Sequence, residues 1–245
     1  MKRICVYCGS SPGKLNEYRE AARSLGHEMA GRGFGLVYGG ASVGVMGAVA
    51  DAVLERGGEA IGVIPYALAT KEVSHHGLNE LIVVDSMHER KARMAELSDG
   101  FIALPGGWGT IEEIFEMLTW AQLGFHEKPC GLLNVASYYD PLYTFLEQAI
   151  DQRFVKEEFR PMMMMENSAG ILLDRFAAYR APKVKKWIGP EETCPQGVLV
   201  PVMIRVRTID HIVLHTQNVE EMVRFYSEIL CCPVERTLPP ETGLT

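Results

Sequence analysis

A glycine-rich turn between an apolar run and an expected helix is the part of this sequence best suited to chemistry. Residues 101–104 are apolar, Pro105 ends the run, and three glycines follow at positions 106, 107 and 109. A helix is expected to begin near Thr110. Such a turn directs unpaired backbone N–H groups and the positive end of the helix dipole at whatever lies above the strand end. We therefore expect an anion such as phosphate to bind there.

Two explanations are open for the acid that follows this turn. If Thr110 is the N-cap of the helix, Glu113 lies at N3 and completes a capping box, so helix initiation alone accounts for both residues. Alternatively, the Glu113 carboxylate takes part in chemistry at the turn. The glycine spacing does not decide between them, because it matches neither the Walker pattern nor the G-x-G-x-x-G dinucleotide fingerprint.

Two consecutive cations lie at a helix start elsewhere in the chain. Asp85 and Ser86 can cap this helix, with Glu89 at N3. Arg90 and Lys91 then fall in about its first turn, where the helix dipole disfavours cations by a few tenths of a kcal/mol to about 1 kcal/mol. An anionic ligand would reverse that sign, whereas a surface salt bridge to Glu89, Asp85 or another exposed acid would explain the cations without a ligand.

The elements that must position these residues alternate along the chain. Strands are predicted at residues 3–8, 35–38, 59–64, 81–84, 101–104 and 130–135, and helices at 16–32, 45–55, 87–98, 110–123, 140–152 and 168–180. This alternation implies parallel strands with right-handed crossovers, and hence an α/β fold with a doubly wound, Rossmann-like parallel sheet. Small-residue turns follow residues 8, 38 and 104, at strand ends where such folds bind ligands, so the three turns should converge on one cleft. Tight packing alone is the other explanation for their glycines.

Stretches in order along residues 1–189 resemble blocks of the Lonely Guy family. Residues 105–113 match its PGGxGTxxE signature, with Trp108 at the variable position. The members of this family are cytokinin riboside 5′-monophosphate phosphoribohydrolases, long mislabelled as lysine decarboxylases. The other matching blocks are Cys8-Gly9-Ser10-Ser11, Tyr38-Gly39-Gly40, Val43-Gly44-Val45-Met46-Gly47, Val63-Ile64-Pro65, Met87-His88-Glu89-Arg90-Lys91 and Lys128-Pro129-Cys130-Gly131-Leu132-Leu133-Asn134.

The resemblance implies a nucleotide-binding hydrolase, a glycosidase of cytokinin biosynthesis. Its reaction would be hydrolysis of the N-glycosidic bond of adenosine 5′-monophosphate or an N6-modified form, releasing adenine or a cytokinin and ribose 5-phosphate. Arg90 and Glu113 are the implied catalytic pair, and their meeting from two different helices is a prediction. No cofactor and no metal are implied. The implied substrate contacts, besides that pair, are Glu72, Lys91, Gly107, Trp108, Gly109, Thr110, Ile111, Glu112 and Thr119.

Composition indicates an ordinary globular protein. Of its 245 residues, 47% are hydrophobic and 22% are charged, and the formal net charge is −7. That charge argues against nucleic acid or an anionic membrane as a partner, so an anionic substrate needs a local positive site. Because no apolar run approaches the length of a membrane span and no signal-peptide core follows Met1, we expect the cytosol.

Cysteines and histidines do not predict a metal site. Cys5 and Cys8 should point to opposite faces of one strand, so neither a shared metal nor a disulfide is expected, and the six cysteines are interpreted as reduced thiols. His75 and His76 fall within residues 66–80, interpreted as a polar loop or helix, where a solvated loop explains them better than a ligand pair.

The helix predicted at residues 110–123 carries apolar side chains on too many sides for a one-sided surface helix. Burial within the domain and burial against a second subunit would both explain this. The family resemblance favours the second, and with it a homodimer. The run from Met162 to Met165 is expected to fill irregular apolar space at the core or an interface.

The composition changes at Gly189. Residues 190–205 indicate a linker, and residues 206–245 resemble the first β-α unit of a glyoxalase, or vicinal-oxygen-chelate, module. The histidine matching His211 can bind a metal in such modules, but this short appended fragment lacks the partner ligands. We therefore predict one hydrolase domain at residues 1–189, followed by a linker and a truncated fragment.

Three other functions are open from the sequence. A regulatory protein could bind the nucleotide in the same cleft without hydrolysing it. Decarboxylation of lysine with pyridoxal phosphate follows only from the old family label, since nothing identifies a Schiff-base lysine in the cleft. Metal-dependent vicinal-oxygen-chelate chemistry needs ligands that the chain lacks.

Overall fold

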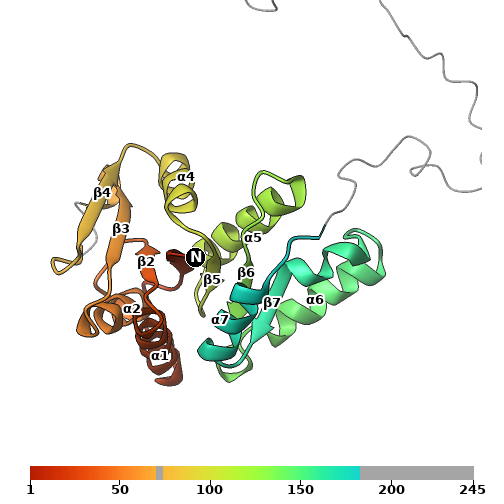
Figure 1. Cartoon of the computed structure of the whole chain (residues 1–245), viewed down its shortest axis with the longest axis horizontal. Coiled ribbons are helices and arrows are strands. Elements are labelled where there is room, and N and C mark those ends of the chain that lie inside the picture. The colour runs from red at the N-terminus through yellow and green to blue at the C-terminus, as the bar shows by residue number, and fades with distance from the viewer. Residues whose placement is uncertain (70–73, 183–245) are drawn as a thin grey trace, which may run out of the picture. The chain divides into compact units, whose positions relative to one another are not determined.

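One parallel sheet organises the protein, whose computed structural model describes residues 1–69 and 74–182. Within this part, seven strands pair in the order β4-β3-β2-β1-β5-β6-β7 (Figure 1). The strands are β1 (Arg3–Tyr7), β2 (Gly35–Tyr38), β3 (Ala60–Pro65), β4 (Glu80–Val84), β5 (Phe101–Ala103), β6 (Cys130–Leu133) and β7 (Met163–Glu166). The predicted α/β fold is therefore confirmed. The predicted linker at 190–205 and the fragment at 206–245 lie outside the described residues.

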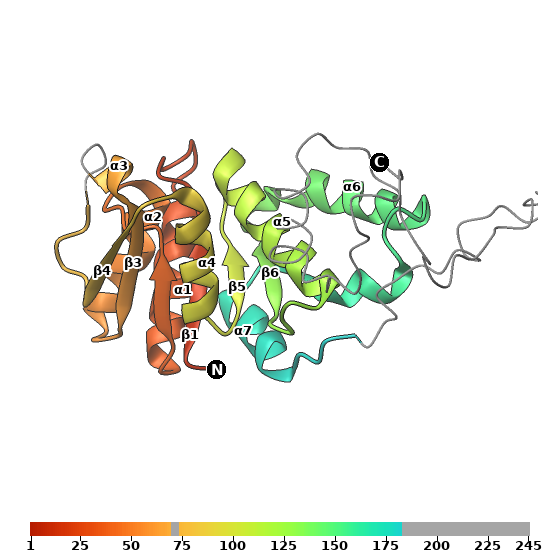
Figure 2. The same cartoon turned by 90° about the horizontal axis from the view of Figure 1, so that it is seen from above.

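Helices pack against both faces of the sheet, which explains why its inner strands are continuous apolar runs rather than alternating ones. One layer holds α1 (Glu17–Gly31), α2 (Gly44–Glu55) and α7 (Ala169–Ala178). The other holds α4 (Met87–Leu97), α5 (Trp108–Leu123) and α6 (Asp140–Asp151), which follow one another across the sheet in Figure 2. The short elements are α3 (Tyr66–Ala69) and the 3₁₀ turns η1 (Val135–Ser137) and η2 (Glu157–Met162). Cys5 and Cys8 are free, buried thiols in the apolar layers on opposite faces of the sheet, as the alternation of side chains along a strand predicts.

The order of the strands defines where a ligand can enter. From β1 the chain moves outward through β2 and β3 to β4, and then crosses to β5 on the other side of β1. The turns after β1 and β5 therefore diverge from neighbouring strand ends, which is where doubly wound folds bind ligands. Gly9 N–H donates to the Pro105 carbonyl at 3.3 Å and holds these two turns together.

Met163 to Met165 form a strand, so the prediction of irregular packing was wrong for these residues, whereas the predicted place in the core is confirmed for Met162 and Met164. Met163 to Met165 pair in parallel with Cys130 to Leu132, which places β7 at the edge of the sheet, beyond the strand predicted to be the last. Four identical residues carry no apolar–polar alternation, and methionine is not a typical strand former. The partner strand therefore determines this conformation, and local preference does not.

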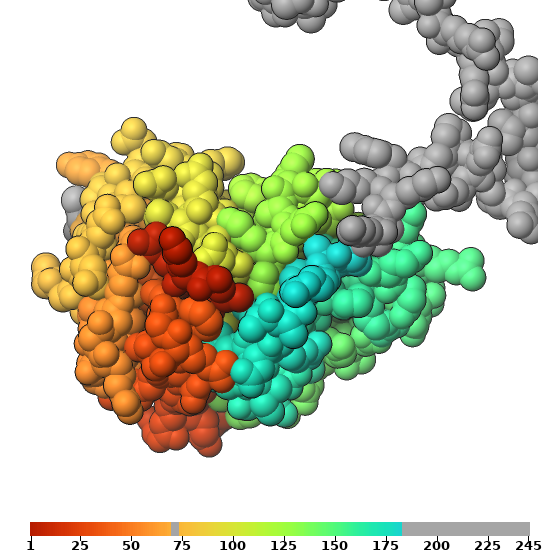
Figure 3. Space-filling model, viewed as in Figure 1, coloured from red at the N-terminus to blue at the C-terminus, as the bar shows by residue number. Residues whose placement is uncertain are grey.

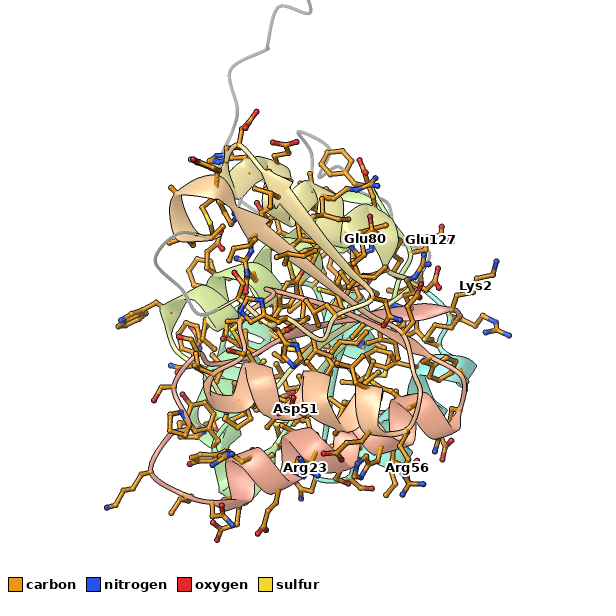
Figure 4. The ribbon with its side chains drawn as sticks, turned by 90° about the vertical axis from the view of Figure 1, so that its left-hand side faces the viewer. Lys2, Arg23, Asp51, Arg56, Glu80 and Glu127 are labelled. Atoms are coloured by element: carbon orange, nitrogen blue, oxygen red, sulfur yellow. The ribbon has the colours of Figure 1, made fainter. Side chains whose placement is uncertain are left out.

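His75 is also not part of a solvated loop. Its side chain is only 11% exposed, and Nε2 lies 3.0 Å from Oδ1 of Asp51 on α2, a residue labelled in Figure 4. Its Nδ1 accepts a hydrogen bond from Gly77 N–H, and its own N–H donates to the Gly40 carbonyl. His75 thus ties its segment to the turn after β2, while His76 is exposed as predicted.

The described residues contain no group of three or more His, Cys, Asp or Glu side chains arranged to hold a metal. Among the helices of the same described residues, none combines the length and the apolar character needed to cross a membrane.

Candidate active site

The three small-residue turns meet at one cleft, as the topology predicted. A cleft of about 260 Å³ lies at the carboxyl ends of β1, β2 and β5. Residues 8–10 line it from the first turn, Gly39 from the second, and Gly107 and Gly109 from the third. Much of its remaining wall comes from α4 and α5, whose segments lie side by side in Figures 2 and 3, and single residues of α2, β3 and α3 complete it.

Helix α5 begins two residues earlier than predicted, and this rules out the capping box. Gly107 is its N-cap, with no side-chain capping bond, so Thr110 is already at N3 and Glu113 lies in the second turn. Thr110 is 4% exposed and packs over Gly106, where a Cβ would approach its hydroxyl to well under 3.0 Å. Helix initiation therefore does not explain Glu113.

Glu113 forms a buried ion pair with Arg90. Arg90 Nη1 donates to Glu113 Oε1 at 2.8 Å, and the two side chains are 11% and 9% exposed. Arg90 Nε donates to the Val63 carbonyl at 3.0 Å, which anchors the guanidinium to the end of β3. Within the described part of the chain its other N–H groups have no protein partner, so they remain for a ligand.

The helix that carries Arg90 has the predicted cap. Ser86 Oγ accepts from Glu89 N–H at 3.1 Å, and Glu89 Oε2 accepts from Asp85 N–H at 2.9 Å. Because Glu89 is used in this cap and Arg90 pairs across to α5, the surface salt bridge considered for Arg90 is absent. The Arg90 side chain instead lines the cleft.

Burial controls the protonation of Glu113. Loss of water raises the pKa of its carboxyl, the neighbouring Arg90 charge works to lower it, and Glu112 works to raise it, and the pKa remains raised. Without Arg90 this carboxyl would hold a proton more tightly. The positive charge of Arg90 thus favours the ionised form of a carboxyl that burial alone would favour as protonated.

Lys91 is held by two carboxylates of α5. Its ammonium lies 2.5 Å from Glu112 Oε1 and 3.1 Å from Glu116 Oε2. Burial works to lower the pKa of Lys91, but the hydrogen bonds to these two acids outweigh it and the pKa is raised. A lysine held protonated in this way is poorly suited to form a Schiff base, because that chemistry requires the neutral amine.

The structure brings most of the sequence-predicted site residues to the cleft. The lining includes Arg90, Gly107, Gly109, Thr110, Glu112 and Glu113. Lys91 is outside the lining but pairs with Glu112, Ile111 is half-buried outside the lining, and Trp108 projects into solvent at 94% exposure. Glu72 lies outside the described residues.

Thr119 is not part of the cleft of its own chain. It lines a separate apolar groove between α5 and α6, and its hydroxyl donates to the Phe115 carbonyl at 2.7 Å. A substrate contact from Thr119 would therefore have to be made to the cleft of another chain.

Sequence reasoning missed an apolar wall and one acid. Side chains of five residues line the cleft near Arg90, namely Met46, Ile64, Leu68, Met87 and Met94. Ile64 could have been found from its place at the end of β3, but the others depend on helix orientation. The role of Glu116 as a partner of Lys91 could have been predicted from its i, i+4 spacing to Glu112. Two like charges on one helix face destabilise the helix unless a cation lies near both.

A glycine-lined cleft at the switch point of a doubly wound sheet, with a buried Arg–Glu pair, defines a Rossmann-like α/β protein equipped for a small anionic ligand. Within that class the chain belongs to the Lonely Guy family. Residues 46–176 match the family model described as "Possible lysine decarboxylase". The resemblance inferred from the sequence blocks is thereby confirmed.

Curated relatives agree with this assignment. Cytokinin riboside 5′-monophosphate phosphoribohydrolase LOG5 of Arabidopsis thaliana is 50% identical over 179 residues, covering 73% of this chain and 78% of that protein. Cytokinin riboside 5′-monophosphate phosphoribohydrolase LOG of Oryza sativa subsp. japonica is 48% identical over 178 residues, covering 73% and 74%.

Solved structures share the fold at lower identity. The molybdenum cofactor binding protein of Rippkaea orientalis is 23% identical, with a TM-score of 0.56 over 73% of this chain and 97% of that one. The molybdenum cofactor carrier protein of Chlamydomonas reinhardtii is also 23% identical, with a TM-score of 0.55 over 73% and 99%. These similarities establish the Rossmann-like fold alone.

Proposed function

We propose that this protein hydrolyses the N-glycosidic bond of adenosine 5′-monophosphate or an N6-modified form, releasing the free base and ribose 5-phosphate. The observation that carries the proposal is the buried Arg90–Glu113 pair, 2.8 Å apart, beside a turn of backbone N–H groups. The names of the relatives that are about half identical to this chain support the same reaction.

The phosphate takes the N-terminus of α5. The turn of residues 107–110 presents backbone N–H groups at the cleft, and the helix dipole adds partial positive charge. The absence of side chains at Gly107 and Gly109, where a Cβ would meet nothing within 4 Å, leaves the backbone open to the ligand. Trp108, Ile111 and Glu112 contribute through the same turn.

Glu113 and Arg90 act at the sugar and the base. Cleavage passes through an oxocarbenium-like state, whose positive charge a nearby carboxylate stabilises, and the same carboxylate can position and deprotonate the attacking water. Arg90 lowers the pKa of Glu113 against the effect of burial, which favours the carboxylate, and its unpaired N–H groups donate to the substrate. Lys91 and Glu72 complete the nucleotide contacts.

We place the enzyme in the cytosol. The described cysteines, Cys5, Cys8 and Cys130, are buried free thiols, which suits a reducing compartment. Its net charge of −7 argues against nucleic acid and anionic membranes as partners.

The test is release of base from adenosine monophosphate and from its N6-isopentenyl counterpart, followed by chromatography, with binding measured in parallel by calorimetry. We expect release from at least one substrate, and the ratio of kcat/KM identifies the preferred base. Binding of both nucleotides without release would contradict the hydrolase and support a regulatory nucleotide-binding protein.

We further propose that the working form is a homodimer joined along α5 and α6. The groove between them, about 250 Å³, is lined mainly by apolar side chains, including Phe115, Leu118 and Leu146. Although α6 is strongly amphipathic, none of its residues is buried within the chain. A second copy seated here would cover this surface and bring its own Thr119 toward the neighbouring cleft.

Replacing Leu146 with Glu should convert the dimer into a monomer, because a charge would be buried in the apolar interface. Light scattering measures the mass, and we expect it to halve. Ile171→Glu on α7, where the side chain is 53% exposed, is the matched control and should leave the mass unchanged. A variant that stays dimeric would place the interface elsewhere, and one that is monomeric but fully active would remove Thr119 from the site.

A further inference from the structure

The backbone conformation at position 39 does not by itself require a glycine. The next residue, Gly40, has φ of 82°, in the left-handed region where a side chain is strained, but Gly39 is not among the described glycines with positive φ. An alanine could therefore adopt the conformation at position 39. The explanation for glycine there must come from its surroundings.

Those surroundings are filled by the proposed catalytic arginine. A Cβ built on Gly39 would lie under 3.0 Å from Arg90 Nη2 and from Met46 Cε, closer than real Cβ contacts. Both atoms are the ends of long side chains, so the fold can accommodate an alanine by moving one of them. The question is what that movement does to Arg90.

Arg90 has little freedom to move without losing its partners. Its planar guanidinium is bounded on three sides, since Nε donates to the Val63 carbonyl, Nη1 donates to Glu113, and Nη2 lies against Gly39. The plane is rigid, so pressure at Nη2 is transmitted to the other two nitrogens. The side chain is 11% exposed and cannot swing into open solvent without leaving this slot.

We infer that Gly39 is a positioning residue: its missing Cβ lets Arg90 occupy the slot between Val63 and Glu113 in which it acts. This inference rests on the proposed function for its effect on rate. Gly39 contacts the arginine, and it influences the reaction through that contact. Because Gly39 also lines the cleft, the rival explanation is that glycine leaves room for the ligand itself.

The two explanations predict different kinetics for Gly39→Ala. Displacement of Arg90 should lower kcat by about 10- to 100-fold, since misplacing a catalytic group by about 1 Å costs up to about 100-fold, with KM changed by less than about threefold. Lost room for the ligand should instead raise KM and leave kcat nearly intact. A rise in KM alone would overturn the inference.

A double-mutant cycle with Arg90→Ala isolates the route of the effect. If Gly39 acts through Arg90, adding Gly39→Ala to Arg90→Ala should cost less than about twofold more. Full additivity of the two losses would overturn the inference. A second cycle with Met46→Ala tests the other close contact, and recovery of kcat there would assign the effect to Met46.

Two controls distinguish displacement of Arg90 from a general effect of replacing a glycine. Gly31→Ala, where a Cβ would meet nothing within 4 Å, reports the general effect of replacing a glycine, and we expect wild-type kinetics. A crystal structure of the Gly39→Ala variant should show that Nη1 no longer lies within hydrogen-bond distance of Glu113, whereas an unmoved Arg90 would overturn the inference whatever the activity. If wild type releases no base, the proposed function fails, and the same cycle is then measured as affinity for adenosine monophosphate, where non-additive weakening is expected.

Discussion

Replacing Glu113 with Gln should lower base release by about 1,000-fold while nucleotide affinity changes by less than about threefold. Gln has nearly the size of Glu and keeps an oxygen that can accept from Arg90 Nη1, so the buried site stays packed. It carries no charge, however, and can neither stabilise an oxocarbenium-like centre nor take a proton from water. The loss should therefore fall on kcat and leave binding largely unaffected.

The measurement compares base release under saturating nucleotide with calorimetric binding for wild type and variant. Glu96→Gln on α4 is the matched control, because that acid is 65% exposed and pairs with Arg93 at the surface. It should keep wild-type rates. If Glu113→Gln retained more than about a tenth of the wild-type rate, far above the loss expected for an essential acid–base group, Glu113 would be a structural partner of Arg90 and nothing more.

Removing Arg90 should impair both stability and activity, and the stability loss should depend on pH. Arg90→Ala leaves Glu113 buried without its cation, and breaking one side of a buried pair costs about 3–5 kcal/mol. The variant should also lose about 100-fold or more in kcat, because donors aimed at the substrate disappear.

The pH dependence follows from the raised pKa of Glu113. Burial raises this pKa in the folded protein above its unfolded value, and loss of Arg90 removes the main opposing effect, so the rise becomes larger. The folded state then binds the proton more tightly than the unfolded state. This contribution to stability is fully present below the unfolded pKa and is lost as pH rises through the folded pKa.

The variant should therefore be destabilised less at pH 5 than at pH 8, relative to wild type at the same pH. Urea unfolding at both pH values measures this difference. In the double variant Arg90→Ala with Glu113→Gln, no titrating carboxyl remains at position 113, and the difference between the two pH values, measured relative to Glu113→Gln alone, should largely vanish. A destabilisation equal at pH 5 and pH 8 would mean that Arg90 stabilises by packing alone.

The sequence determined most of the local structure. Strand and helix positions followed from apolar runs, periodicity and punctuation by glycine, and the cap of α4 at Ser86 and Glu89 is present as predicted. The convergence of the three turns could also be predicted, because it is a consequence of parallel topology. These features depend on residues close together in the chain or on general rules of chain connection.

The tertiary structure decided what the residues at those positions do. Because α5 begins two residues earlier than predicted, Glu113 is not part of a helix cap. The packing of α4 beside α5 brings Arg90 to Glu113 as its ion-pair partner. Pairing with a neighbouring strand makes Met163 to Met165 part of β7, and His75 pairs with Asp51 of α2. Thr119 lies about two turns beyond Glu112 along α5, where it lines a separate groove and not the cleft of its own chain.

The physical reason is the range over which each signal acts. Periodicity, caps and turn residues report interactions within a few positions, whereas an ion pair such as Arg90–Glu113 depends on the distance between two helices packed on one sheet. Gly39 illustrates the difference. Its residue type is visible in the sequence, but the atoms that occupy the space of its missing side chain come from Arg90 and Met46, and only the folded chain brings them there.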